Sequence, residues 1–111
     1  MIRFFQNLFA GRKTNYLAEL PAVNTKIEIY KADWCSHCRT ALRLLSKINA
    51  TNIHIYDIEK QRDKGHEMVR RAGRYTIPQI FIGDEHVGGS DDLMKAATSG
   101  RLLGLLMADH D

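Results

Sequence analysis

Four short stretches of the chain are rich in apolar residues and are bounded by polar or turn-forming residues, the pattern typical of β-strands. They cover residues 27–30, 53–57, 79–82 and 85–87. In the first two stretches isoleucines alternate with a polar residue, as expected when one face of a strand is buried. The last two flank Gly83-Asp84, a dipeptide that favours the tight turn of a β-hairpin.

Between and after these strands, apolar residues recur at steps of three and four, which predicts amphipathic helices. The predicted helices cover roughly residues 36–49, 65–72, 90–99 and 102–107. The first of them has an apolar face formed by Cys38, Ala41, Leu42, Leu45 and Ile48. Gly73 and Gly100 follow the second and third, in the position where glycine commonly ends a helix.

The order of the elements indicates the fold class. Two strands joined through a helix pair in parallel, whereas the hairpin adds antiparallel partners. We therefore predict an α/β protein with a mixed four-stranded sheet covered by helices, which begins near Lys26 and continues through residues 26–111.

Residues 1–25 precede this domain as an N-terminal extension. Residues 1–10 predict an extra amphipathic helix with one apolar arc, which consists of Met1, Ile2, Phe4, Phe5, Leu8 and Phe9. Residues 12–25 have the character of a connector, with Pro21 and Asn24 as breakers. Three interpretations of the helix compete: packing on the domain or a partner, contact with an anionic membrane surface, and a targeting signal.

Composition narrows the class of protein. The chain has 111 residues, of which 44% are hydrophobic, so it can form one domain with a packed core. It contains no apolar run as long as a bilayer requires, so we expect no transmembrane helix. The net charge of +3 is too small to indicate a nucleic-acid partner. We expect a monomer.

Both cysteines of the chain lie together in the sequence Cys35-Ser36-His37-Cys38. A disulfide between residues three apart closes almost no loop and contributes little to stability, which favours a chemical role. Such a reversible dithiol suits a reducing compartment, and we predict a cytoplasmic protein. A structural zinc site needs four ligands and a second cysteine pair is missing, so no metal site is expected.

The predicted position of the two sulfurs separates their roles. Cys35 lies where a strand leads into a helix, and the free N–H groups and partial positive charge of a helix start stabilise a thiolate. Thiolates are the species that attack disulfides, so Cys35 is the expected nucleophile. Cys38 lies on the apolar face with Leu42 and Leu45, and we expect it to be a buried resolving thiol.

Three segments occur in an order that resembles the glutaredoxin family. They are residues 27–38 with the cysteine pair, Thr76-Ile77-Pro78 with the strand that follows, and the run 88–93. The resemblance covers about residues 26–107. It implies a thioredoxin-like three-layer fold and glutathione as co-substrate.

The resemblance also implies a glutathione site. Pro78 is expected to be cis, with the backbone of Ile77 pairing with glutathione as a strand edge does. The carboxylate of the γ-glutamyl end is expected at Gly89 and Ser90, and its amine at Asp91. The alternatives are that Pro78 merely starts a strand and that Ser90 is an ordinary helix cap.

Two departures from the family pattern bear on function. Similar proteins often carry lysine three residues before the first cysteine, where this chain has Ala32 and, one step earlier, Lys31. Another low-molecular-weight thiol is therefore a second candidate co-substrate. The second departure lies between the cysteines, where many relatives have proline and tyrosine and this chain has Ser36 and His37. His37 either tunes the thiolate or faces solvent. Relatives without proline at the position of Ser36 can bridge a [2Fe–2S] cluster between two protomers.

We therefore predict a glutathione-dependent thiol–disulfide oxidoreductase that reduces protein–glutathione mixed disulfides and protein disulfides through Cys35 and Cys38. The alternative prediction is a dimeric carrier or sensor that holds a [2Fe–2S] cluster with Cys35 and glutathione. A third is a redox-inert interaction module.

Overall fold

The computed structural model describes residues 14–108, and its centre is a four-stranded sheet. The strands are β1 (Ile27–Lys31), β2 (Ile53–Asp57), β3 (Gln79–Ile82) and β4 (Glu85–Gly88). They lie in the order β2-β1-β3-β4. β1 is parallel to β2 and antiparallel to β3, and β3 is antiparallel to β4, so the predicted mixed sheet is confirmed.

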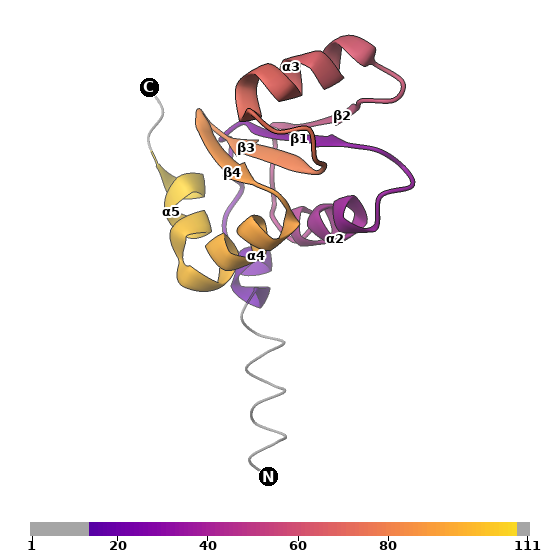
Figure 1. The fold of residues 1–111 in the computed structure, drawn as a ribbon. Coiled ribbons are helices and arrows are strands. Elements are labelled where there is room, and N and C mark those ends of the chain that lie inside the picture. Colours follow the sequence, from indigo (N-terminus) through magenta and orange to yellow (C-terminus); the bar gives the residue numbers. More distant parts are fainter. Residues whose placement is uncertain (1–13, 109–111) are drawn as a thin grey trace.

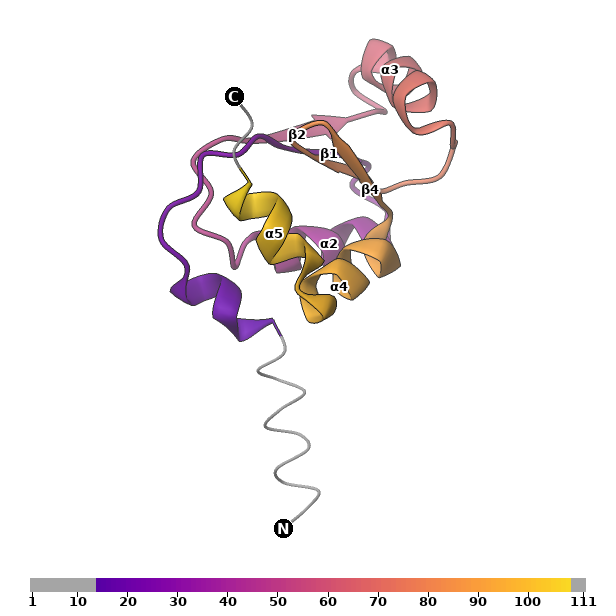
Figure 2. The same cartoon turned by 90° about the vertical axis from the view of Figure 1, so that its left-hand side faces the viewer.

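Helices cover both faces of the sheet. They are α2 (Ser36–Leu45), α3 (Arg62–Ala72), α4 (Ser90–Ser99) and α5 (Arg101–Met107). Figures 1 and 2 show α3 on one face and α2 with α4 on the other, with α5 beside α4. This is the predicted α/β, thioredoxin-like three-layer arrangement. Among residues 14–108, no helix has the length and apolarity needed to cross a bilayer.

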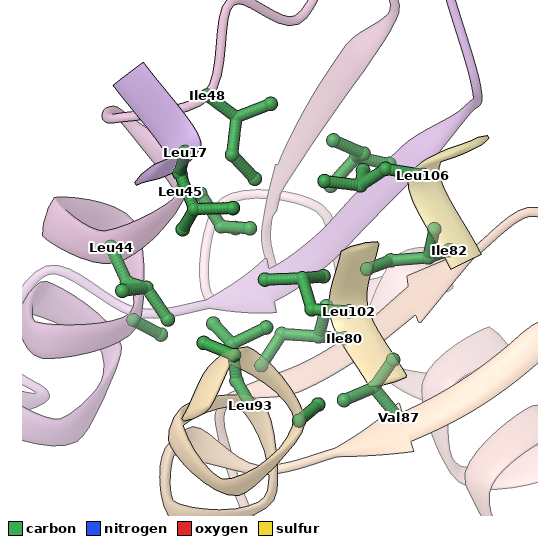
Figure 3. Close-up of a cluster of buried hydrophobic side chains, with 14 of the residues drawn as sticks. Leu17, Leu44, Leu45, Ile48, Ile80, Ile82, Val87, Leu93, Leu102 and Leu106 are labelled. Carbon is green, nitrogen blue, oxygen red and sulfur yellow. The ribbon is translucent and has the colours of Figure 1, made fainter. Parts of the chain in front are cut away.

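The main hydrophobic core lies between the sheet and the α2–α4 layer. β1 contributes Ile27 and Ile29, and the antiparallel register places them opposite Ile82 and Ile80 of β3. Leucines from the helices complete this cluster, as Figure 3 shows, and those labelled there are Leu17, Leu44, Leu45, Leu93, Leu102 and Leu106. A fully buried leucine such as Leu93 would cost about 3 kcal/mol to replace with alanine.

The opposite face of the sheet, under α3, combines aromatic and charged residues. Glu28 of β1 is buried and accepts two hydrogen bonds from the Arg71 guanidinium, each at 3.1 Å. Burial raises the pKa of Glu28, but the hydrogen bonds from Arg71 and Tyr56 outweigh it and the pKa lies below its ordinary value. This charge pair ties α3 to β1 and β2.

The predicted connector contributes to the core. Residues Asn15–Glu19 form a 3-10 helix, η1, and Leu17 is fully buried in the main cluster. Val23 bridges to Ala50. The core therefore begins before Lys26, because these two apolar residues cover the end of the sheet. The predicted helix over residues 1–10 lies outside the described residues.

α2 is shorter than predicted. The apolar period predicts a helix to residue 49, whereas α2 ends at Leu45. Turn hydrogen bonds then follow, from the N–H of Lys47 to the Leu44 carbonyl and from that of Ile48 to the Leu45 carbonyl. Ile48 still packs in the core, so its apolar character marks burial in a turn and not a continuing helix.

Candidate active site

Cys35 is the N-cap residue of α2. Its backbone is extended, with φ −84° and ψ 112°, and its sulfur accepts a hydrogen bond from the Cys38 N–H at 3.1 Å. The side chain is 5% exposed, at the mouth of the site. A helix start without an acidic residue in its first turn surrounds this sulfur with positive potential.

Cys38 lies one turn further along α2 and has no exposed surface. Burial, together with the neighbouring Cys35 sulfur, raises the pKa of Cys38 to about 12. Both thiols are free. The prediction that Cys38 is buried is confirmed, and Cys35 is nearly as buried, with 5% of its surface exposed.

The loop before β3 meets Cys35 from the opposite side. The Ile77–Pro78 peptide bond is cis, as the resemblance implies. The Cys35 thiol points at the Ile77 carbonyl oxygen, 3.8 Å away. Gly89 packs against Pro78, since a Cβ at Gly89 would lie 3.6 Å from the Pro78 carbonyl oxygen. This contact brings the start of α4 to the same corner as the start of α2.

A polar hollow lies between these elements, next to the cysteine pair. We call it the polar hollow; it is lined by His37, Arg74, Thr76, Ile77, Pro78, Gln79, Gly89, Ser90, Asp91 and Asp92. The five residues predicted to bind glutathione are all among them. The first turn of α4 offers N–H groups without intrahelical partners, and Asp92 accepts the Gly89 N–H at 2.9 Å.

Two residues that were not predicted as site residues support one side of this hollow through hydrogen bonds. Gln79 is fully buried and donates from Nε2 to the Thr76 carbonyl at 3.0 Å. His86 of β4 contacts the Gln79 Oε1 at 2.7 Å through its Nε2. The chain of contacts fixes the turn that presents Ile77. No local sequence signal marks His86, because its partner Gln79 lies on the neighbouring strand β3.

Lys31 is engaged away from the polar hollow. Its Nζ lies 2.6 Å from an Asp33 oxygen and 3.4 Å from an Asp57 oxygen. The two carboxylates raise the pKa of Lys31, with Asp33 as the main cause. Arg74 is the cation that lines the hollow, 3.6 Å from Asp92.

The described residues of one chain do not assemble a metal site. Across residues 14–108, no group of three or more His, Cys, Asp or Glu side chains is placed to hold a metal ion. The chain has two cysteines, and both are buried, Cys38 completely. A [2Fe–2S] cluster usually takes four ligands, so the predicted alternative requires ligands from outside this chain.

Comparisons with known proteins agree with the geometry. A family model described as Glutaredoxin matches residues 27–87. Glutaredoxin 3 of Escherichia coli strain K12 is 40% identical over 80 residues, which cover 72% of this chain and 95% of that protein. The solution structure of glutaredoxin from Brucella melitensis is 38% identical, with a TM-score of 0.64, and covers 78% of this chain and 94% of that one.

A more distant structural likeness concerns the fold alone. The crystal structure of a buckwheat glutaredoxin–glutathione complex has a TM-score of 0.65 at 21% identity, over 86% of this chain and 84% of that one. The family model and the relatives of higher identity carry the assignment. The chain belongs to the glutaredoxin family, whose members are glutathione-linked thiol–disulfide oxidoreductases.

Proposed function

We propose that this protein uses glutathione to reduce mixed disulfides between proteins and glutathione, with Cys35 as the nucleophile. One observation carries the proposal. The Cys35 sulfur lies at the start of α2, accepts the Cys38 N–H at 3.1 Å, and is adjacent to the polar hollow. The helix start places positive potential at this sulfur, and a cysteine sulfur attacks disulfides as the anion.

The reaction has two exchange steps. The Cys35 thiolate attacks the glutathione sulfur of the mixed disulfide, so that a Cys35–glutathione bond forms and the protein leaves as a thiolate that takes up a proton. A second glutathione thiolate then attacks the bound glutathione sulfur. Oxidised glutathione is released and the Cys35 thiolate is regenerated.

Cys38 has the second role, as a resolving thiol for protein disulfides. Burial and its high pKa make it a poor first attacker. It is only one helical turn from Cys35, so it can displace a protein that is linked to Cys35 by a mixed disulfide. The product is a Cys35–Cys38 disulfide, which glutathione reduces.

The polar hollow is the proposed glutathione site. The backbone of Ile77 beside cis Pro78 offers an N–H and a carbonyl in the manner of a strand edge. The α4 start at Gly89 and Ser90 suits a carboxylate, and Asp91 suits an ammonium group. Arg74, and not Lys31, supplies the positive side chain in this hollow.

The test is turnover of a glutathionylated peptide with glutathione as reductant, in wild type, Cys35→Ser and Cys38→Ser. Cys35→Ser is expected to lose at least about a thousandfold in kcat/KM, because the remaining thiol, Cys38, has no exposed surface and a raised pKa. Cys38→Ser is expected to keep turnover of this substrate and to lose reduction of a protein disulfide. Retained activity in Cys35→Ser would contradict the proposal.

A further inference from the structure

We propose that a second hollow beside Cys35 binds the polypeptide half of the mixed disulfide and prefers an apolar side chain next to the reacting cysteine. This inference rests on the proposed function and specifies its substrate class. The hollow has a volume of about 420 Å³. We call it the aromatic hollow; it is lined by Trp34, Cys35, Ser36, His37, Tyr75, Thr76 and Ile77.

Two aromatic side chains form the outer part of this hollow and are exposed. Trp34 is 67% exposed and Tyr75 is 85% exposed. They come from different loops, Trp34 from the one that precedes α2 and Tyr75 from the one between α3 and β3. Exposed large aromatic residues that meet around a concave surface are typical of binding sites, where Trp and Tyr often dominate the binding energy.

The charges of the two hollows differ. The polar hollow is lined by Arg74, Asp91 and Asp92, which suit a ligand that carries charges of both signs. Among the described residues that line the aromatic hollow, there is no Asp, Glu, Lys or Arg. A charged tripeptide such as glutathione therefore finds counter-charges in the polar hollow, whereas the aromatic hollow favours an apolar group.

The two hollows adjoin each other. His37, Thr76 and Ile77 line both of them and form the boundary. Cys35 lines the aromatic hollow and its thiol points at the Ile77 carbonyl, so the reacting sulfur lies beside this boundary. When glutathione occupies the polar hollow, the peptide to which it is linked leaves it at this boundary, and its residues next to the cysteine meet Trp34 and Tyr75.

The chemical step is unchanged by this contact. The Cys35 thiolate forms a bond to the glutathione sulfur, the bond from that sulfur to the peptide breaks, and the peptide thiolate is protonated by solvent. Contact with Trp34 and Tyr75 holds the peptide while this exchange occurs. It therefore acts on kcat/KM and discriminates between peptide sequences.

The experiment compares two glutathionylated peptides that differ only in the residue after the cysteine, which is phenylalanine or serine. Wild type is expected to favour the phenylalanine peptide by about tenfold in kcat/KM, a factor that corresponds to roughly 1.4 kcal/mol. The Trp34→Ala/Tyr75→Ala double variant is expected to reduce this ratio to about one. Met107→Ala, which removes a 46% exposed side chain on α5, is the control and keeps the tenfold ratio.

The outcomes separate the two proposals. If wild type turns over neither peptide, the proposed function fails. If it turns over both peptides at equal rates, or if the double variant keeps the preference, the proposed function stands and the aromatic hollow is not a peptide site.

A second readout leaves Trp34 and Tyr75 unchanged. Trp34 is the one tryptophan of the chain, so its fluorescence reports this site directly. In Cys38→Ser, each peptide is linked to Cys35 as a stable mixed disulfide. The phenylalanine peptide is expected to shift the Trp34 emission to shorter wavelength than the serine peptide does, because it buries the indole. Identical emission in the two adducts would overturn the inference.

Discussion

The starts of α2 and α4 meet at the same corner of the molecule but differ in their first turns. α2, with Cys35 as its N-cap, has no acidic residue in its first turn, whereas α4, with Gly89 as its N-cap, carries Asp91 and Asp92 there. A helix start is electropositive in both cases. In α4 the carboxylates of the first turn compensate part of this positive charge. In α2 no carboxylate does, and the Cys35 sulfur is the group that lies at the positive end. Under the proposed function, the same backbone feature serves chemistry in α2 and binding in α4.

The largest expected effect concerns the reactivity of Cys38, one turn into α2, and sharpens this comparison. Burial and the neighbouring Cys35 sulfur raise the pKa of Cys38 to about 12, and burial, the larger cause, remains in Cys35→Ser. In this variant, alkylation of Cys38 by iodoacetamide near pH 8 is expected to be at least about a hundredfold slower than that of an ordinary cysteine. The rate is expected to rise continuously as the pH approaches 11. Mass spectrometry measures it, and a plateau near pH 9 would contradict the assignment of Cys38 as the buried partner.

An acidic residue placed at the start of α2 breaks the comparison by giving α2 the charge pattern of α4. Ser36→Asp is expected to slow alkylation of Cys35 at neutral pH by about tenfold, because a carboxylate near the sulfur disfavours the thiolate. Ser36→Asn, of nearly the same shape and without charge, is the matched control and is expected to react at close to the wild-type rate. Equal rates in Ser36→Asp and Ser36→Asn would show that the helix charge does not govern Cys35.

The smallest expected effect concerns the stability of α4. Asp92 accepts the Gly89 N–H at 2.9 Å, and Asp92→Ala removes this cap. The expected loss is about 1 kcal/mol, or roughly 4–8 °C in Tm. Asp91→Ala, which removes a carboxylate from the same turn and leaves the cap in place, is expected to destabilise the protein less. Thermal unfolding followed by circular dichroism makes the comparison, and equal losses would show that the cap contributes nothing.

Much of this site could be predicted from the sequence because its determinants are local. The alternation in residues 27–30 and the steps of three and four that follow Cys35 predict a strand that leads into a helix, and the structure has both. The resemblance to glutaredoxins, and not periodicity, then identifies the segments around Cys38, Pro78 and Ser90 as the three that meet. The strand and the helix are predicted from short-range periodicity, whereas the meeting of the three segments is predicted from the family pattern.

The features that could not be predicted depend on which side chains the fold brings into contact. Leu17 looks like part of a connector until the core that it completes is known. The pairing of Glu28 with Arg71 joins β1 to α3, and the contact of His86 with Gln79 joins β4 to β3. Nothing in the sequence relates Trp34 to Tyr75, which lies 41 residues later in the chain. Only the fold shows that they line one hollow.

The most direct test of the central claim is to identify which sulfur first receives glutathione. Reduced protein is mixed with oxidised glutathione, quenched by acid at short times, and mapped by mass spectrometry. The account predicts a Cys35–glutathione adduct that gives way to a Cys35–Cys38 disulfide in wild type and persists in Cys38→Ser. A first adduct on Cys38, or one that forms in Cys35→Ser at the wild-type rate, would contradict it.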